Sequence, residues 1–153
     1  RNINKIIIHC SATKPNMDIG ADVIRDWHVN GNGWSDIGYH QVIRRDGTPE
    51  AGRDIARSGA HCKGHNHDSV GVCMVGGIDD DGKPECNFTL RQWRTLDSII
   101  EGYLTKFPNA TVHGHNEFSS KIALRLTLGG IVIEQVPVQA IYVPLQGELE
   151  LAW

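Results

Sequence analysis

Two short apolar runs constrain the fold more than any other feature of the chain. Residues 5–10 (KIIIHC) and 70–75 (VGVCMV) are rich in β-branched side chains, and glycines close the second run. Runs of this length and composition are typical of buried strands. Because helical segments separate them along the chain, the pattern predicts an α/β fold.

Two segments have the apolar spacing of helices. Residues 19–27 place apolar side chains on one helical face and are followed by Asn-Gly-Asn-Gly, which ends helices. Thr89 and Gln92 have the spacing of a capping box, and they precede an apolar stripe over residues 90–107 that stops before a proline. We therefore expect one short helix and one long amphipathic helix.

The remaining elements are short strands. Residues 39–45 and 48–52 flank an Asp-Gly pair that suits a tight hairpin turn, and residues 110–113 form a further β-prone run. Strands that alternate with helices predict a mixed central β-sheet flanked by helices.

Charge and hydropathy exclude several classes of function. The chain has 153 residues, a net charge of −3 and a pI near 6.2, so a nucleic-acid-binding surface is not expected. It has no apolar run approaching the ~18 residues of a membrane span. The spacing of the four cysteines is not typical of a disulfide framework, and no signal peptide is recognisable. Together these features favour reduced thiols in a cytosolic setting.

The composition changes near residue 122. All eight histidines lie between His9 and His115, and residues 122–153 contain no Asp, Asn, His, Ser, Lys, Phe, Cys or Met. This change divides the chain into residues 1–121 and a divergent C-terminal segment, residues 122–153.

Two histidines at strand ends are candidates for metal ligation. His9 ends the first apolar run, and His115 follows the run at residues 110–113. A catalytic zinc site needs three protein ligands and an open position for water, so this pair would be part of such a site. Two hydrogen-bonded histidines without metal are the alternative. Tyr39 and Lys121 are further candidates, because a phenol and an ammonium can orient water or stabilise an oxyanion; a packed Tyr and a solvated Lys are the alternatives.

A second group of potential ligands lies in one loop. His61, His65 and His67, with Cys62, are spaced like metal ligands, but their polar surroundings are also typical of an exposed loop. Cys10 follows His9 on the strand, so it faces the opposite side and is expected in the core.

The order of short motifs resembles a known enzyme family. The matching segments are residues 7–15 (IIHCSATKP), 24–28 (IRDWH), 38–40 (GYH), 45–48 (RDGT), 50–54 (EAGRD), 64–73 (GHNHDSVGVC), 75–80 (VGGIDD), 87–89 (NFT) and 115–117 (HNE). They are similar to those of the zinc-dependent N-acetylmuramoyl-L-alanine amidases, and in particular of the T7-type phage lysozymes (endolysins), which have the peptidoglycan-recognition-protein fold.

The resemblance implies a role for each matching residue. His9 and His115 match the first two zinc ligands, and Tyr39 and Lys121 match the catalytic tyrosine and lysine. The implied reaction is hydrolysis of the amide bond between N-acetylmuramic acid and L-alanine by a zinc-activated water. Three further residues match positions that line the substrate groove in relatives: His61, Asn66 and Ser69.

The resemblance ends at Lys121. The family continues Lys-x-Cys-Pro-Ser-Phe-Asp-Val, and its Cys is the third zinc ligand, whereas this chain has no Cys after Cys86. Codons exist for residues 122–128 (IALRLTL) that, read from the third base of codon 122, give Cys-Pro-Ser-Phe-Asp-Val. Our hypothesis is that residues 122–153 are translated out of frame after loss of one base; a genuine alternative C-terminus is the other explanation. Zinc affinity is expected to fall severely and amidase activity to be weak or absent, even if His113, Cys62 or a water fills the vacant position.

Three functions follow from these observations. The first is a peptidoglycan amidase, made in the host cytoplasm and acting as a monomer on the cell wall. The second is a metal-free peptidoglycan-binding protein of the same fold, and the third is a regulatory protein that uses the same surface on another protein.

Overall fold

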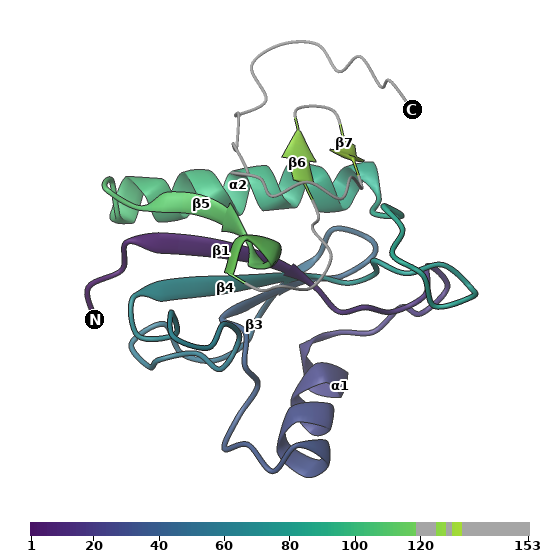
Figure 1. The fold of residues 1–153 in the computed structure, drawn as a ribbon, viewed down its shortest axis with the longest axis horizontal. Coiled ribbons are helices and arrows are strands. Elements are labelled where there is room, and N and C mark those ends of the chain that lie inside the picture. The colour runs from purple at the N-terminus through teal and green to yellow at the C-terminus, as the bar shows by residue number, and fades with distance from the viewer. Residues whose placement is uncertain (119–124, 128–129, 133–153) are drawn as a thin grey trace.

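A five-stranded sheet forms the centre of the fold in the computed structural model, which describes residues 1–118, 125–127 and 130–132 (Figure 1). The strands run in the order β3-β2-β4-β1-β5, and only the β2–β3 pair is antiparallel. Their bounds are β1 Lys5–Cys10, β2 Gln41–Ile43, β3 Pro49–Ala51, β4 Ser69–Met74 and β5 Thr111–Gly114. The predicted mixed sheet, its two apolar strands and its hairpin are confirmed.

The two apolar runs are neighbours at the middle of this sheet. β1 and β4 pair in parallel, with Ile7 opposite Gly71 and His9 opposite Cys73. Because successive side chains of a strand point to opposite faces, His9 and Cys73 lie on one face while Ile6, Ile8 and Val72 lie on the other. One face of the sheet is therefore available to pack into a hydrophobic core, whereas the other face also carries polar side chains.

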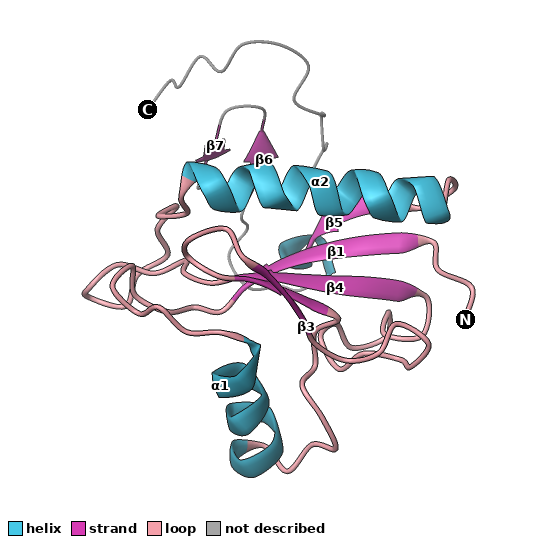
Figure 2. Cartoon of the chain, turned by 180° about the vertical axis from the view of Figure 1, so that it is seen from behind, coloured by secondary structure: helices cyan, strands magenta, loops and turns pink. Residues whose placement is uncertain are grey.

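The long helix α2 (Leu90–Lys106) covers the first of these faces (Figure 2). Its buried Leu96 and Ile100 pack in one cluster with Ile6, Ile8 and Val72 of the central strands. Partly buried side chains packed against the same cluster include Cys10, as predicted. The predicted capping box at Thr89 is present, but Leu90 is 40% exposed, so the apolar stripe begins later than predicted.

The buried residue in the first turn of α2 is polar: it is Gln92. Its side-chain amide donates to the carbonyls of Ile43 (3.2 Å) and Val75 (2.8 Å). Its Oε1 accepts from the amide of Thr89 (3.0 Å) and from Arg45 (3.2 Å). One fully buried side chain thus joins the start of α2 to the ends of β2 and β4.

The Gln92→Leu variant is expected to lose about 2–4 kcal/mol of unfolding free energy. The replacement has a similar volume, but it leaves several buried donors and acceptors with fewer partners, each costing ~1–3 kcal/mol. Urea denaturation measures the loss, with Arg94→Leu on the exposed side of the same helix as the matched control. Equal losses in the two variants would contradict this role for Gln92.

The short helix α1 (Ala21–Asp26) lies on the other side of the sheet (Figures 1 and 2). It continues as a π-helical turn, η1 (Trp27–Gly31), and ends at the predicted Asn-Gly sequence. Ala21 and Ile24 pack with Val42, Cys73 and Val75 in a second cluster. Partly buried residues that contact this cluster include Tyr39, which places the second face of the sheet next to the predicted catalytic tyrosine.

The described residues also bear on three predictions about the whole chain. No described helix has the length and apolarity to cross a membrane. Cys10, Cys62 and Cys73 are free thiols, as the cysteine pattern predicts. After β5 the chain forms a short 3-10 helix, η2 (His115–Phe118). In the C-terminal segment, the described strands β6 (Arg125–Thr127) and β7 (Gly130–Val132) pair in antiparallel orientation. Lys121 and the predicted boundary at residue 122 lie outside the described residues.

Candidate active site

Three of the site residues that the sequence predicted come together on the face of the sheet opposite α2. His9 lies near the carboxyl end of β1, and His115 directly follows the adjacent parallel strand β5. Their ring centroids are 4.7 Å apart, and the ring of Tyr39, just before β2, lies 5.1 Å from that of His9. Carboxyl ends of parallel strands are a common location for binding and catalysis because several loops start there.

His61 joins this group from a loop. Its Nδ1 lies 2.9 Å from Nε2 of His9, and the two rings meet edge to face. The other two residues of the predicted substrate group support the His61 loop: Asn66 Oδ1 accepts from the amides of His61 and Cys62, and Ser69 Oγ contacts His61 Nε2 at 3.3 Å. Ser69 is completely buried, so in this structure it reaches a ligand only through His61.

Burial keeps the site uncharged at neutral pH. It lowers the pKa of His9 well below the usual value, and the neighbouring His61 and His115 lower it further. Burial also lowers the pKa of His115, and together with nearby His and Arg charges it lowers that of His61 to about 3. Neutral imidazoles are the form that binds metal ions. Burial, with Cys73 and Cys10 nearby, raises the pKa of Tyr39 well above its usual value, so the phenol stays protonated.

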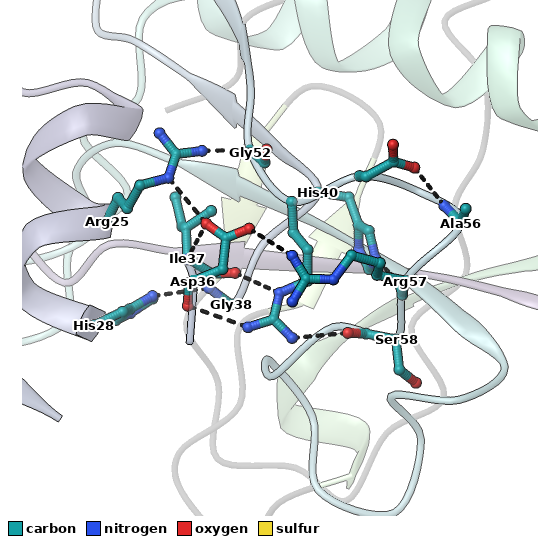
Figure 3. Close-up of polar contacts among 12 residues, drawn as sticks. Arg25, His28, Asp36, Ile37, Gly38, His40, Gly52, Ala56, Arg57 and Ser58 are labelled. Carbon is teal, nitrogen blue, oxygen red and sulfur yellow. Dashed lines mark hydrogen bonds and ion pairs between the residues drawn. The ribbon is translucent and has the colours of Figure 1, made fainter. Parts of the chain in front are cut away.

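A polar network holds the segment that leads into Tyr39. Figure 3 shows Arg25 and Arg57 converging on the carboxylate of Asp36, with distances of 2.9 and 3.2 Å. Burial opposes ionisation of Asp36, but the hydrogen bonds from Arg25 and the Ile37 amide, with the charges of Arg25 and Arg53, hold its pKa below the usual range. Arg53 is buried and donates to the carbonyls of Asp36, Ile37 and Ser58, which ties this segment to the next loop.

His28 is a neighbour of Tyr39 that the sequence did not single out. Its Nδ1 accepts a hydrogen bond from the Gly38 amide at 2.9 Å, and its ring lies 5.5 Å from that of Tyr39 and 4.7 Å from that of Trp34. A Cβ on Gly38 would stand 2.4 Å from the Ala60 carbonyl oxygen and 3.1 Å from the Trp34 ring. The glycine before Tyr39 is therefore required for this close packing.

His40 is a buried structural histidine. Its Nδ1 accepts from the Gly71 amide at 3.0 Å, so its Nε2 carries the proton and donates to the Arg57 carbonyl at 3.0 Å. Burial lowers the pKa of His40, and this effect with the Arg1 and Arg53 charges outweighs the opposing influence of the Arg57 carbonyl and Asp54.

The lowered pKa predicts a pH dependence of stability. Above the unfolded-state pKa of ~6.5, His40 is neutral in both states; below it the unfolded chain takes up the proton first, so stability falls as the pH falls toward the folded-state pKa. His40→Asn keeps an acceptor near the Gly71 amide and does not titrate. Below pH 6.5, the unfolding free energy of His40→Asn is therefore expected to depend less steeply on pH than that of the unaltered chain. The difference in slope is up to ~1.4 kcal/mol per pH unit. Urea titrations at several pH values measure it, with His67→Asn at an exposed position as the control; an unchanged slope in His40→Asn would contradict the assignment.

The loop histidines and Cys62, the second group of potential ligands, do not assemble into a metal site among the described residues. His61 points to His9, the ring of His65 packs 4.3 Å from that of Phe118, and the side chain of His67 is 75% exposed. Burial raises the pKa of the Cys62 thiol, which disfavours the thiolate that would bind metal. Within the described residues, no group of three His, Cys, Asp or Glu side chains is arranged to hold a metal ion.

His113, proposed as a substitute ligand, has both ring nitrogens in use. Nδ1 lies 2.8 Å from Glu117 Oε2, and Nε2 lies 2.6 Å from Thr111 Oγ1. To ligate a metal, it would have to give up the partner of the nitrogen that binds.

Comparison with solved structures defines the class of fold. The amidase LysC from Clostridium intestinale is 26% identical to this chain with a TM-score of 0.68, covering 78% of this chain and 74% of that one. The bumblebee peptidoglycan recognition protein PGRP-SA is 27% identical with a TM-score of 0.67, covering 78% and 73%. The chain therefore has the fold shared by these amidases and peptidoglycan recognition proteins.

Comparison of sequences then shows the family. The sequence model of N-acetylmuramoyl-L-alanine amidases (Amidase_2) matches residues 1–127. The endolysin of Escherichia phage T7 is 51% identical over 116 residues, which are 76% of this chain and 76% of that protein. The chain belongs to the N-acetylmuramoyl-L-alanine amidase family, and its relatives include phage endolysins, as the motifs indicated.

Proposed function

We propose that this chain is built as a peptidoglycan amidase of the endolysin type, which hydrolyses the bond between N-acetylmuramic acid and L-alanine. The observation that carries the proposal is the meeting of His9, His115 and Tyr39 on one face of the sheet, in a chain that belongs to the amidase family. The T7 relative is named an endolysin, which supports the bacterial cell wall as the site of action.

The donor atoms at this site are of the type that zinc prefers. His9 and His115 are neutral, buried or half-buried imidazoles with adjacent rings, which suits them as two nitrogen ligands. Zinc held there would supply an activated water and polarise the scissile carbonyl. The described residues supply no third ligand, and the sequence has no Cys after Cys86. We therefore propose that zinc binding, and with it hydrolysis, is weak in this chain.

Tyr39 has the properties of an oxyanion donor. Its hydroxyl stays protonated because burial raises its pKa, and its ring is fixed between those of His9 and His28. A protonated phenol in a buried site can donate a hydrogen bond to the charge that develops on the substrate carbonyl. Lys121, outside the described residues, is proposed to assist at the same oxygen. His61 is proposed to line the substrate groove next to His9.

We further propose that residues 1–121 form the amidase domain and that residues 122–153 are the product of a reading-frame shift. The support is the absence of the family's Cys-Pro motif after Lys121, together with the change in composition at the same place. The nucleotide sequence of codons 121–130 tests this proposal, because codons that cannot encode Cys in the shifted frame would refute it.

A second candidate function is peptidoglycan binding without hydrolysis. The absence of a third metal ligand among the described residues favours it, and solved relatives include a complex of peptidoglycan recognition proteins LCa and LCx bound to tracheal cytotoxin. In this case the chain would retain its affinity for the cell wall but release no product.

Product chemistry tests both candidates. Purified cell-wall peptidoglycan is incubated with the chain and zinc, and new L-alanine amino termini and new reducing sugar ends are measured. The amidase proposal predicts slow appearance of amino termini without reducing ends, and loss of that signal in His9→Ala. Cosedimentation with peptidoglycan but no amino termini would favour the binding protein, and reducing ends would exclude amidase chemistry as the main reaction.

A further inference from the structure

The ring of His61 occupies a slot that only glycines permit. A Cβ on Gly71 of β4 would stand 2.5 Å from Cγ of His61, and one on Gly59 would stand 2.4 Å from its Cδ2. Real Cβ atoms do not approach this closely, so both positions must lack a side chain. The imidazole is thus held flat against the central strand, with one nitrogen toward His9 and the other toward Ser69.

The hydrogen bonds around this slot form one directed chain. Ser69 Oγ lies 2.6 Å from the carbonyl oxygen of His65, which can only accept, so the single Ser69 hydroxyl proton is used there. Ser69 Oγ must then accept from His61, whose Nε2 carries the proton. A neutral imidazole has one N–H, so His61 Nδ1 is an acceptor, and the donor at 2.9 Å is His9 Nε2–H.

We infer that Ser69 and His61 are positioning residues that fix the tautomer of His9, with the proton on Nε2 and the lone pair on Nδ1. No described residue forms a hydrogen bond to His9 Nδ1. Its lone pair is therefore the one that His9 can offer to a ligand. Metal-ligating histidines commonly have their free nitrogen defined by a hydrogen bond of the other one. Here that partner is a second histidine, oriented in turn by a buried serine. Only the use of this nitrogen for zinc rests on the proposed function; the tautomer does not.

The tautomer is measured on the metal-free protein. Long-range ¹H–¹⁵N correlation spectra of ring-labelled histidine distinguish a protonated from an unprotonated ring nitrogen. Wild type is expected to show His9 in the single Nε2–H form. His61→Phe is expected to give a mixture of both forms. Ser69→Ala is expected to do the same, because without the serine acceptor the His9–His61 bond can reverse its direction.

A conservative variant separates positioning from simple packing. Asn can place an amide oxygen close to the position of Nδ1, so His61→Asn is expected to restore the single His9 tautomer that His61→Phe loses. Ser98→Ala and His67→Phe remove the same residue types at exposed positions and serve as controls. Unfolding midpoints identify variants that are not folded. An Nδ1–H tautomer in wild type, or an unaltered Nε2–H tautomer in folded His61→Phe, would overturn the inference.

Zinc affinity gives a second readout that is independent of lysis. In a chain carrying a Cys two positions after Lys121, His61→Phe is expected to weaken zinc binding by about 10–100-fold in chelator competition, and His61→Asn to recover most of it. Equal zinc affinity in all three proteins would contradict the link to the metal. A chain that carries the added Cys and shows the expected tautomers, but has no amidase activity, would count against the proposed function and leave the inference standing.

Discussion

Replacing residues 123–128 with Cys-Pro-Ser-Phe-Asp-Val is expected to convert a weak or inactive chain into a lytic enzyme. The replacement puts a Cys two positions after Lys121, where the family has its third zinc ligand. Loss of an outer-shell partner alone typically costs 10–100-fold in metal affinity, so gaining a ligand is expected to tighten zinc binding by more than about 10²-fold. Chelator competition measures the affinity, and turbidity loss of a cell-wall suspension measures the lysis.

The matched control changes one atom of the new segment. Ser-Pro-Ser-Phe-Asp-Val has the same length and nearly the same shape, but its hydroxyl cannot replace a thiolate as a zinc ligand. It is expected to show the affinity and lysis of the original chain. Equal gains with Cys and Ser would show that the segment acts through folding and not through ligation. Tight, stoichiometric zinc and normal lysis in the unaltered chain would refute the impairment itself.

The sequence predicted the centre of the sheet because the two central strands are mostly apolar. The runs that became β1 and β4 are buried along nearly their whole length, and their polar residues, Lys5, His9 and Ser69, stand at or next to a strand end. The same logic is wrong at the start of α2, where Leu90 is exposed and Gln92 is fully buried. Periodicity cannot detect a buried amide whose partners come from two other strands and a distant arginine.

The site was predicted in part, for a related reason. Strand position brought His9 and His115 to the same end of the sheet, and the structure places their rings in contact distance. The family resemblance indicated His61 but not its orientation, which depends on glycines at positions 59 and 71 that pack against it only in the folded chain. A glycine inside an otherwise apolar strand is a sign of close approach, and Gly71 was the available signal.

Tyr39→Phe, made in the chain with the restored Cys segment, is expected to lower kcat by about 10²–10³-fold, the usual cost of one oxyanion donor. The Phe ring retains the contacts with His9 and His28, so KM, zinc affinity and the unfolding midpoint are expected to change little. Release of L-alanine amino termini at several peptidoglycan concentrations gives kcat and KM separately.

The control for this variant is Tyr103→Phe. Tyr103 is a half-buried tyrosine of α2, on the opposite face of the sheet, and its hydroxyl contacts only Gln41 at 3.4 Å among the hydrogen bonds of the described chain. Removing that hydroxyl changes a similar group without touching the site, so kcat is expected to stay at the level of the restored chain. If Tyr39→Phe and Tyr103→Phe have the same kcat, the Tyr39 hydroxyl does not stabilise the transition state. If zinc affinity falls in Tyr39→Phe together with kcat, the ring holds His9 in place and the role assigned to the hydroxyl is wrong.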